Sequence, residues 1–137
     1  MTPDALQSRS IQSAELSPDG ACVILRFEDD GPAVSVGPVA KDTTSPDEEE
    51  GRFSNALATS ESEPGREMDD PQSLLGRFLE RGFKKVSKAG YAEARRALRV
   101  ELEDEAGATR PLYLFCAETY DGAQVSSFDR LGLTTAY

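Results

Sequence analysis

The stretch PQSLLGRFLERGFKKVSKAGYAEARRALR, residues 71–99, decides the fold that the sequence predicts. Large apolar residues recur in it at intervals of three and four from Leu74 to Val86, the spacing of one helical face. The sequence therefore predicts an amphipathic helix over residues 72–88, ended by Gly90. Because the apolar face of such a helix needs a surface to pack on, we expect the flanking segments to form a sheet.

The same stretch holds most of the positive charge of the chain. Residues 72–99 carry eight basic and two acidic residues, whereas the whole chain has 15 basic and 25 acidic residues and a net charge of −10. We expect a basic helix face that binds a partner. The candidate partner-binding residues are Arg77, Arg81, Lys84, Lys85, Lys88, Arg95 and Arg96. The simpler alternative is that these side chains only solvate the outward face of a core helix.

Residues 41–70 differ from the rest of the chain in composition. Asp, Glu, Ser, Thr, Pro and Gly dominate, and Phe53, Leu57 and Met68 are the only large apolar residues. A segment of this composition cannot bury enough apolar surface to offset the entropy lost on ordering, so we expect a disordered acidic loop. Residues 42–71 carry ten acidic and two basic residues, and a tethered anion so close to the basic face would mask it. A tolerated insertion without a function is the alternative.

Three hydroxyl side chains in this loop match acidophilic kinase sites, if the source is eukaryotic. Thr44, Ser45 and Ser60 are each followed three residues later by Asp or Glu. Phosphate at these positions would add negative charge and strengthen the mask. The motif is short and frequently matches by accident.

Apolar runs elsewhere in the chain predict six short strands. They lie at residues 10–16, 21–28, 33–36, 97–104, 110–118 and 124–128. Residues 131–137 are expected either to dock on the sheet or to fray. The predicted class is α+β, a single domain over residues 1–137. It combines a mostly antiparallel sheet, in β-β-β-α-β-β-β order, with one packed amphipathic helix.

The residue types of the chain argue against catalysis and against a bound metal. Histidine is absent, which removes the commonest general base and the imidazole metal ligand. Cys22 and Cys116 lie in apolar runs without CxxC spacing, so we expect buried thiols. Acidic clusters at 28–30, 47–50 and 103–105 lack the ligand pattern of a calcium loop and are expected to be solvated turns. We therefore expect no catalytic residue, no metal and no cofactor.

The expected function is that of a non-catalytic protein-interaction or adaptor module, which uses a sheet edge or the basic helix face. Its partner would be a protein with an acidic surface. Nucleic acid and anionic lipid are alternative ligands, and exposed sheet edges would also allow a homodimer. Bacterial secretion chaperones resemble this chain in being small, acidic and built from strands around helices, and are a second hypothesis. An enzyme with a pocket near the carboxylates of Glu101, Glu118 or Asp121 is a third.

The sequence also predicts where the protein resides. No apolar run approaches the length needed to cross a bilayer, so we expect no transmembrane segment. Residues 1–10 lack the basic start and apolar centre of a secretory signal. A cytoplasmic protein is therefore expected, or a nuclear one if the source is eukaryotic.

Overall fold

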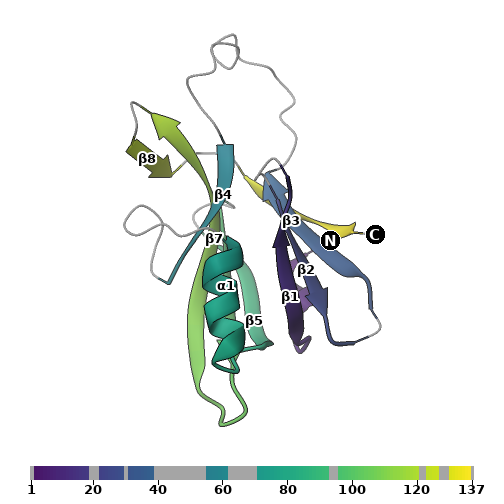
Figure 1. The fold of residues 1–137 in the computed structure, drawn as a ribbon. Coiled ribbons are helices and arrows are strands. Elements are labelled where there is room, and N and C mark those ends of the chain that lie inside the picture. Colours follow the sequence, from purple (N-terminus) through teal and green to yellow (C-terminus); the bar gives the residue numbers. More distant parts are fainter. Residues whose placement is uncertain are drawn as a thin grey trace.

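In a computed structural model, the chain forms antiparallel β-structure around an α-helix (Figure 1). The structure describes residues 2–18, 22–29, 31–38, 55–61, 71–92, 96–120, 123–126 and 130–136. Within these ranges the strands are β1 Ile11–Leu16, β2 Val23–Phe27, β3 Ala33–Pro38, β4 Asn55–Ser60, β5 Lys85–Ala92, β6 Ala97–Glu103, β7 Thr109–Tyr120, β8 Ala123–Ser126 and β9 Leu131–Ala136. The helix α1 spans Pro71–Glu80, and a short 3-10 helix η1 spans Pro3–Leu6. The predicted α+β class is confirmed.

The strands form two antiparallel sheets that meet at one edge. The smaller sheet has the order β1-β2-β3-β9, and the larger has the order β4-β7-β6-β5, with β8 paired to the end of β7. Just before β1, Ser10 forms a β-bridge with Lys85, and the Ile11 N–H donates to the Lys84 carbonyl at 2.8 Å. The β1 edge of the smaller sheet thus continues into the β5 edge of the larger one.

Helix α1 packs against β1 and β4, and so lies against both sheets (Figure 1). Pro71, Leu74, Leu75 and Phe78 form its buried side. Leu74, Leu75 and Phe78 share one apolar cluster with the inner faces of both sheets. The strand residues in that cluster include Val23, Leu25, Val34, Val36, Leu98, Leu102, Leu112, Leu114 and Leu133. One core therefore fixes the helix and the two sheets to one another.

The helix is shorter than the sequence predicted. It ends at Glu80, and Gly82 at φ 86° turns the chain in a Schellman motif. In this motif the Phe83 N–H donates to the Phe78 carbonyl (2.9 Å), and the two rings lie 6.0 Å apart between centroids. The residues that follow form strand β5, from which Val86 points into the core and is fully buried. The apolar spacing did not distinguish a longer helix from a helix followed by a strand. Val86 would face the core in either structure.

Strand β4 lies inside the predicted acidic loop of residues 41–70, and in this part the prediction of disorder was wrong. It pairs with β7 over its whole length, from Asn55↔Glu118 to Ser60↔Tyr113. Its residues Leu57 to Ser60 are buried. The segment has small side chains and no alternating pattern, so its strand conformation follows from the free edge that β7 offers. The rest of the loop, apart from Glu61, lies outside the described residues.

Two glycines provide a matched test of where the helix ends. A Cβ built on Gly76, within α1, would meet nothing within 4 Å, so Gly76→Ala is expected to stabilise the fold by about 1 kcal/mol. Gly82 has equal space but a φ of 86°, so Gly82→Ala is expected to destabilise it by about 1–2 kcal/mol. Urea unfolding of both variants measures the two effects. Stabilisation by both would mean that the helix runs on past Glu80.

Candidate functional site

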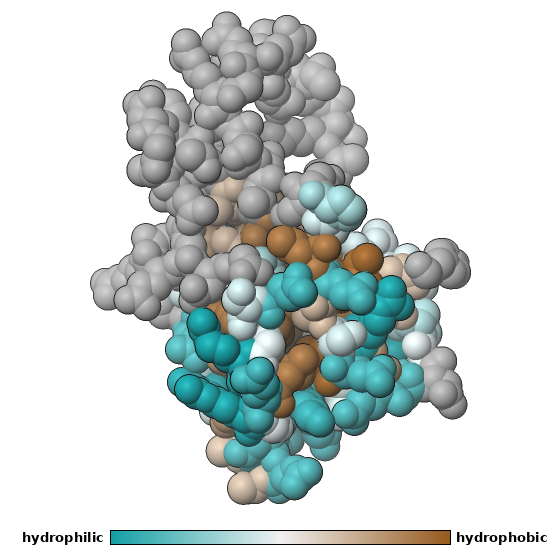
Figure 2. Space-filling model, viewed as in Figure 1, coloured by the Kyte–Doolittle hydropathy of each residue, from teal (hydrophilic) through white to brown (hydrophobic). Residues whose placement is uncertain are grey.

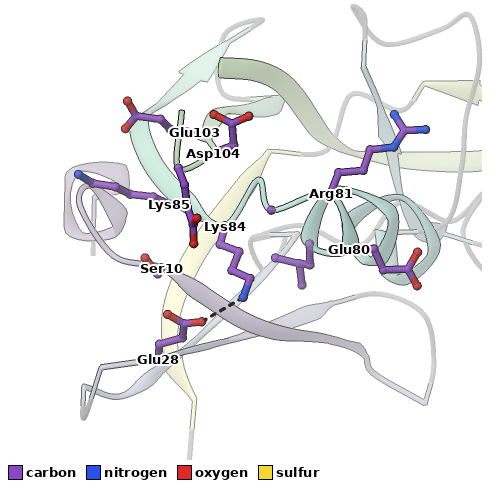
Figure 3. A pocket seen from close by; sticks show the side chains of 11 residues that line it. Ser10, Glu28, Glu80, Arg81, Lys84, Lys85, Glu103 and Asp104 are labelled. Carbon is purple, nitrogen blue, oxygen red and sulfur yellow. Dashed lines mark ion pairs between the residues drawn. The ribbon is translucent and has the colours of Figure 1, made fainter. Parts of the chain in front are cut away.

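A hollow of about 570 Å³ lies where the end of α1, the start of β5 and the β6–β7 turn meet (Figure 3). Its lining residues come from segments far apart in the sequence. They are Ser10, Glu28, Leu79, Glu80, Arg81, Gly82, Lys84, Lys85, Glu103, Asp104 and Glu105. Five of them are acidic and three are basic. The hollow is therefore a site of mixed charge.

Antiparallel pairing across both sheets assembles the hollow. The Glu28 N–H donates to the Ser10 carbonyl at 2.9 Å, beside the β1–β2 ladder. Ser10 is also the bridge partner of Lys85, which in turn lies opposite Glu103 in the β5–β6 ladder. Glu28, Ser10, Lys85 and Glu103 thus follow one another in a row from the smaller sheet to the larger. Side chains of opposite charge are fixed in this row by the backbone.

Lys84 forms an ion pair across the hollow. Its Nζ lies 3.6 Å from Glu28 Oε1, and both side chains are 49% exposed. Figure 3 shows the Lys84 side chain extending toward Glu28. Because water screens a pair this exposed, it contributes at most about 1 kcal/mol to stability. Either charge is therefore free to exchange its partner for a ligand group at low cost.

The β6–β7 turn presents the second group of carboxylates. Asp104 Oδ1 accepts hydrogen bonds from the N–H groups of Ala106 (3.0 Å) and Ala108 (2.8 Å), and Gly107 has a φ of 89°. These bonds hold the turn in one conformation. The role of Asp104 is thus partly structural, and the fixed turn places Glu103 and Glu105 at the hollow.

The seven predicted partner-binding residues do not form one helix face, because α1 ends before most of them. The residues divide as follows: Arg77 lies on α1, Arg81 in the turn after it, Lys84 just before β5, and Lys85 and Lys88 on β5. Arg96 is half-buried beside β6, and Arg95 lies outside the described residues. Three of the seven line the hollow, namely Arg81, Lys84 and Lys85. The structure brings these three together with acidic turns that the sequence did not connect to them.

Of the three predicted phosphorylation sites, only Ser60 lies among the described residues. It belongs to β4 and is 3% exposed, so its hydroxyl is closed to a kinase while that strand is folded. Thr44 and Ser45 lie outside the described residues. The masking of basic residues by the acidic loop stays a prediction. A deletion that tests it has to end before Asn55, because β4 begins there.

The outer face of the larger sheet carries an ordered group around Arg99. Its Nε donates to the Tyr113 hydroxyl at 3.2 Å, and its Nη2 lies 3.0 Å from Glu101 Oε1. The hydrogen bond to Tyr113, together with Glu101, raises the pKa of Arg99. Glu101 is thus engaged by a cation and does not line the hollow. The side chain of Glu118 and the whole of Asp121 lie outside the described part.

The described residues hold no prepared metal site. No group of three or more Cys, Asp or Glu side chains among them is arranged to hold a metal ion. Neither Cys22 nor Cys116 forms a disulfide; Cys116 is buried in β7 and Cys22 is half-buried. The second cysteine is therefore as the sequence predicted, and the first is partly accessible.

The surface seen in Figure 2 is mostly hydrophilic where residues are described, with apolar atoms between the polar side chains. Among the described residues, no helix combines the length and apolar character that a membrane span requires. Comparison with protein-family models, curated proteins and solved structures gives no match. The function has to be argued from the site itself.

Proposed function

We propose that this protein is a non-catalytic interaction module, and that its hollow binds an extended, charged segment of a partner protein. The observation that carries the proposal is the row of alternating charge that runs from Glu28 through Lys85 to Glu103. A backbone ladder fixes the spacing of these charges. An incoming segment with the complementary order would therefore meet charges that are already positioned, which favours specificity.

The state of the carboxylates supports binding over acid–base catalysis. A catalytic carboxylate is typically withdrawn from bulk solvent. Glu28 is instead half-exposed and paired with Lys84, and Asp104 Oδ1 accepts two N–H groups of its own turn. Charges of this kind are suited to exchanging one ionic partner for another.

Mixed charge also supports a protein partner over a nucleic acid. Binding to a polyanion uses a continuous basic stripe, and each acidic side chain in the stripe opposes it. The hollow has more acidic than basic side chains. A protein segment that carries both signs would pair with both sets. This refines the acidic partner expected from the sequence to one of mixed charge.

Two lysines of β5 allow a matched test of the proposal. Lys85 and Lys88 are both exposed, and each lies opposite a glutamate of β6, but only Lys85 lines the hollow. Lys85→Glu is expected to weaken partner binding at least about tenfold, whereas Lys88→Glu should change it by less than about twofold. Partners are first cross-linked to the full chain in its native cells. The affinity of each recovered partner for the three proteins is then measured by titration.

The two variants have the same net charge, so non-specific electrostatics would affect them alike. Equal weakening by both variants would indicate a diffuse charge effect and contradict the hollow as the site. An unchanged affinity of Lys85→Glu would contradict it equally. Far-UV circular dichroism establishes that both variants keep the fold before the affinities are compared.

A further inference from the structure

We propose that β9 is a self-association edge, at which two copies of this chain join their smaller sheets by antiparallel β9–β9 pairing. The proposal is independent of the hollow, which lies at the junction with β5. The proposal is based on a difference between β9 and the other strands that lie at the edges of the two sheets. A sheet edge presents unpaired N–H and C=O groups, and proteins usually block such edges with charges, bulges or a covering element.

The other outer strands differ from β9. Strand β8, which pairs with the end of β7, has only four residues, and a short edge is a poor template for pairing. In β5 the register shifts at Ser87, and Lys85 and Lys88 are exposed. In β1 the register also shifts after Ile11, and α1 packs on this strand. Helix α1 contacts β4 as well, and just beyond that strand Glu61 forms a 3.1 Å ion pair with Arg110. Each of these edges is therefore unsuited to pairing with a further strand.

Strand β9 has none of these features. It pairs with β3 through six consecutive residues, from Ala33↔Ala136 to Pro38↔Leu131, without a register shift. Its sequence, Leu-Gly-Leu-Thr-Thr-Ala, contains no charge and no proline. No described strand pairs with its other edge, since β9 is the last strand in the order β1-β2-β3-β9. From Gly132 to Ala136 it is thus a straight, neutral strand on which no other described strand lies.

A second copy of the chain is the occupant that this edge fits best. Antiparallel pairing of two identical strands closes around a two-fold axis, so one neutral strand satisfies both sides of the interface. Thr134 and Thr135 are exposed and would face the partner's threonines, a favourable cross-strand pair. Leu133, 5% exposed on the inner face, would extend the apolar layer across the junction. A charged partner would find nothing to pair with on β9.

Salt separates this association from binding at the hollow. Two copies that each carry a net charge of −10 repel one another, and added salt screens that repulsion. We therefore expect the β9 dimer to strengthen as ionic strength rises. Ion-pair recognition at the hollow should weaken under the same conditions.

Sedimentation of the full chain over a concentration series tests the proposal. The wild type is expected to dimerise with a dissociation constant on the order of 10 µM, because a single strand pair makes a small interface. Thr134→Lys should weaken the dimer at least about tenfold, since an edge lysine would face its own copy. Gln12→Lys is the matched control, because Gln12 is exposed on β1 at the opposite end of the same sheet.

Amide exchange of the wild type gives a second readout that needs no variant. Protection of residues 133–136 is expected to rise with protein concentration as the outer edge of β9 becomes paired. A wild type that stays monomeric at about 200 µM overturns the proposal. So does a folded Thr134→Lys variant that dimerises as strongly as Gln12→Lys. If the Lys85→Glu variant still dimerises, β9 pairing is supported even where the hollow binds no partner.

Discussion

Replacing Phe78 with alanine is expected to lower the free energy of unfolding by about 3–5 kcal/mol. The side chain is 1% exposed and is the largest that α1 places in the core. Its ring lies 6.0 Å from that of Phe83, and the guanidinium of Arg110 lies 5.5 Å from its centroid. The substitution would therefore leave a cavity and also remove the apolar contact that closes the helix end.

Phe83 provides the control for this measurement. It takes part in the same ring contact but is only half-buried, so Phe83→Ala is expected to cost less, about 1–2 kcal/mol. Urea unfolding at neutral pH measures both variants. A loss for Phe78→Ala no larger than that for Phe83→Ala would contradict the placement of α1 in the shared core.

Replacing Arg9 is expected to have the next largest effect, a loss of about 2 kcal/mol from its packing and its bond to a backbone carbonyl. Its side chain is 16% exposed, and its guanidinium carbon lies 3.8 Å from the centroid of the Phe27 ring. Arg9 Nη2 donates to the Pro32 carbonyl at 2.9 Å, and Nε and Nη2 also donate to the two carboxylate oxygens of Asp29 (2.9 and 2.8 Å). The residue thus fastens the start of β1 to the β2–β3 turn. Thermal unfolding of Arg9→Ala measures the loss.

The same contact predicts how stability depends on pH. Hydrogen bonds from Arg9 and from the Gly31 N–H lower the pKa of Asp29 from 3.8 to about 2. Because the folded pKa is the lower one, the ionised carboxylate favours the folded state above about pH 4. This contribution is lost as the pH falls toward about 2.

Substitution of either residue of the Arg9–Asp29 pair tests this pH effect. Removal of the guanidinium in Arg9→Ala should flatten the stability curve between about pH 4 and 2 in part, because the Gly31 N–H still donates to Asp29. Asp29→Asn removes the titrating group and should flatten the curve further. Stability measured by urea unfolding across this range checks the expectation. A slope in Arg9→Ala equal to that of the wild type would show that other carboxylates cause it.

The apolar runs located most of the strands. β1, β2, β3, β6 and β7 lie where these runs predicted them, because strand alternation and turn residues are local features of the sequence. β5 was missed because its apolar residue Val86 fits a helical spacing from Leu75 and Phe78. The decisive local signal was Gly82, whose positive φ ends the helix. β4 had no local signal, since its pairing with β7 sets its conformation.

The candidate site was predictable only in part. The acidic residues at 28–30 and 103–105 and the basic residues at Lys84 and Lys85 were each visible as clusters. Their convergence depends on the Ser10–Lys85 bridge, which joins segments from opposite halves of the chain. No periodicity within either segment encodes that pairing. With β5 assigned as a strand, the lysines would have been placed on a sheet rather than on a helix face.

The bridge between Ser10 and Lys85 is therefore the contact on which both the joined sheets and the mixed-charge hollow depend. The flanking bonds, Ile11 N–H to the Lys84 carbonyl (2.8 Å) and Val86 N–H to the Arg9 carbonyl (2.9 Å), make it a non-hydrogen-bonded antiparallel pair. In such a pair the Cα atoms approach to about 4.5 Å, so the α-protons face each other closely. A strong nuclear Overhauser effect between the α-protons of Ser10 and Lys85 is predicted. Its absence, together with helical contacts from Lys84 to Lys88, would contradict the fold and the proposed site together.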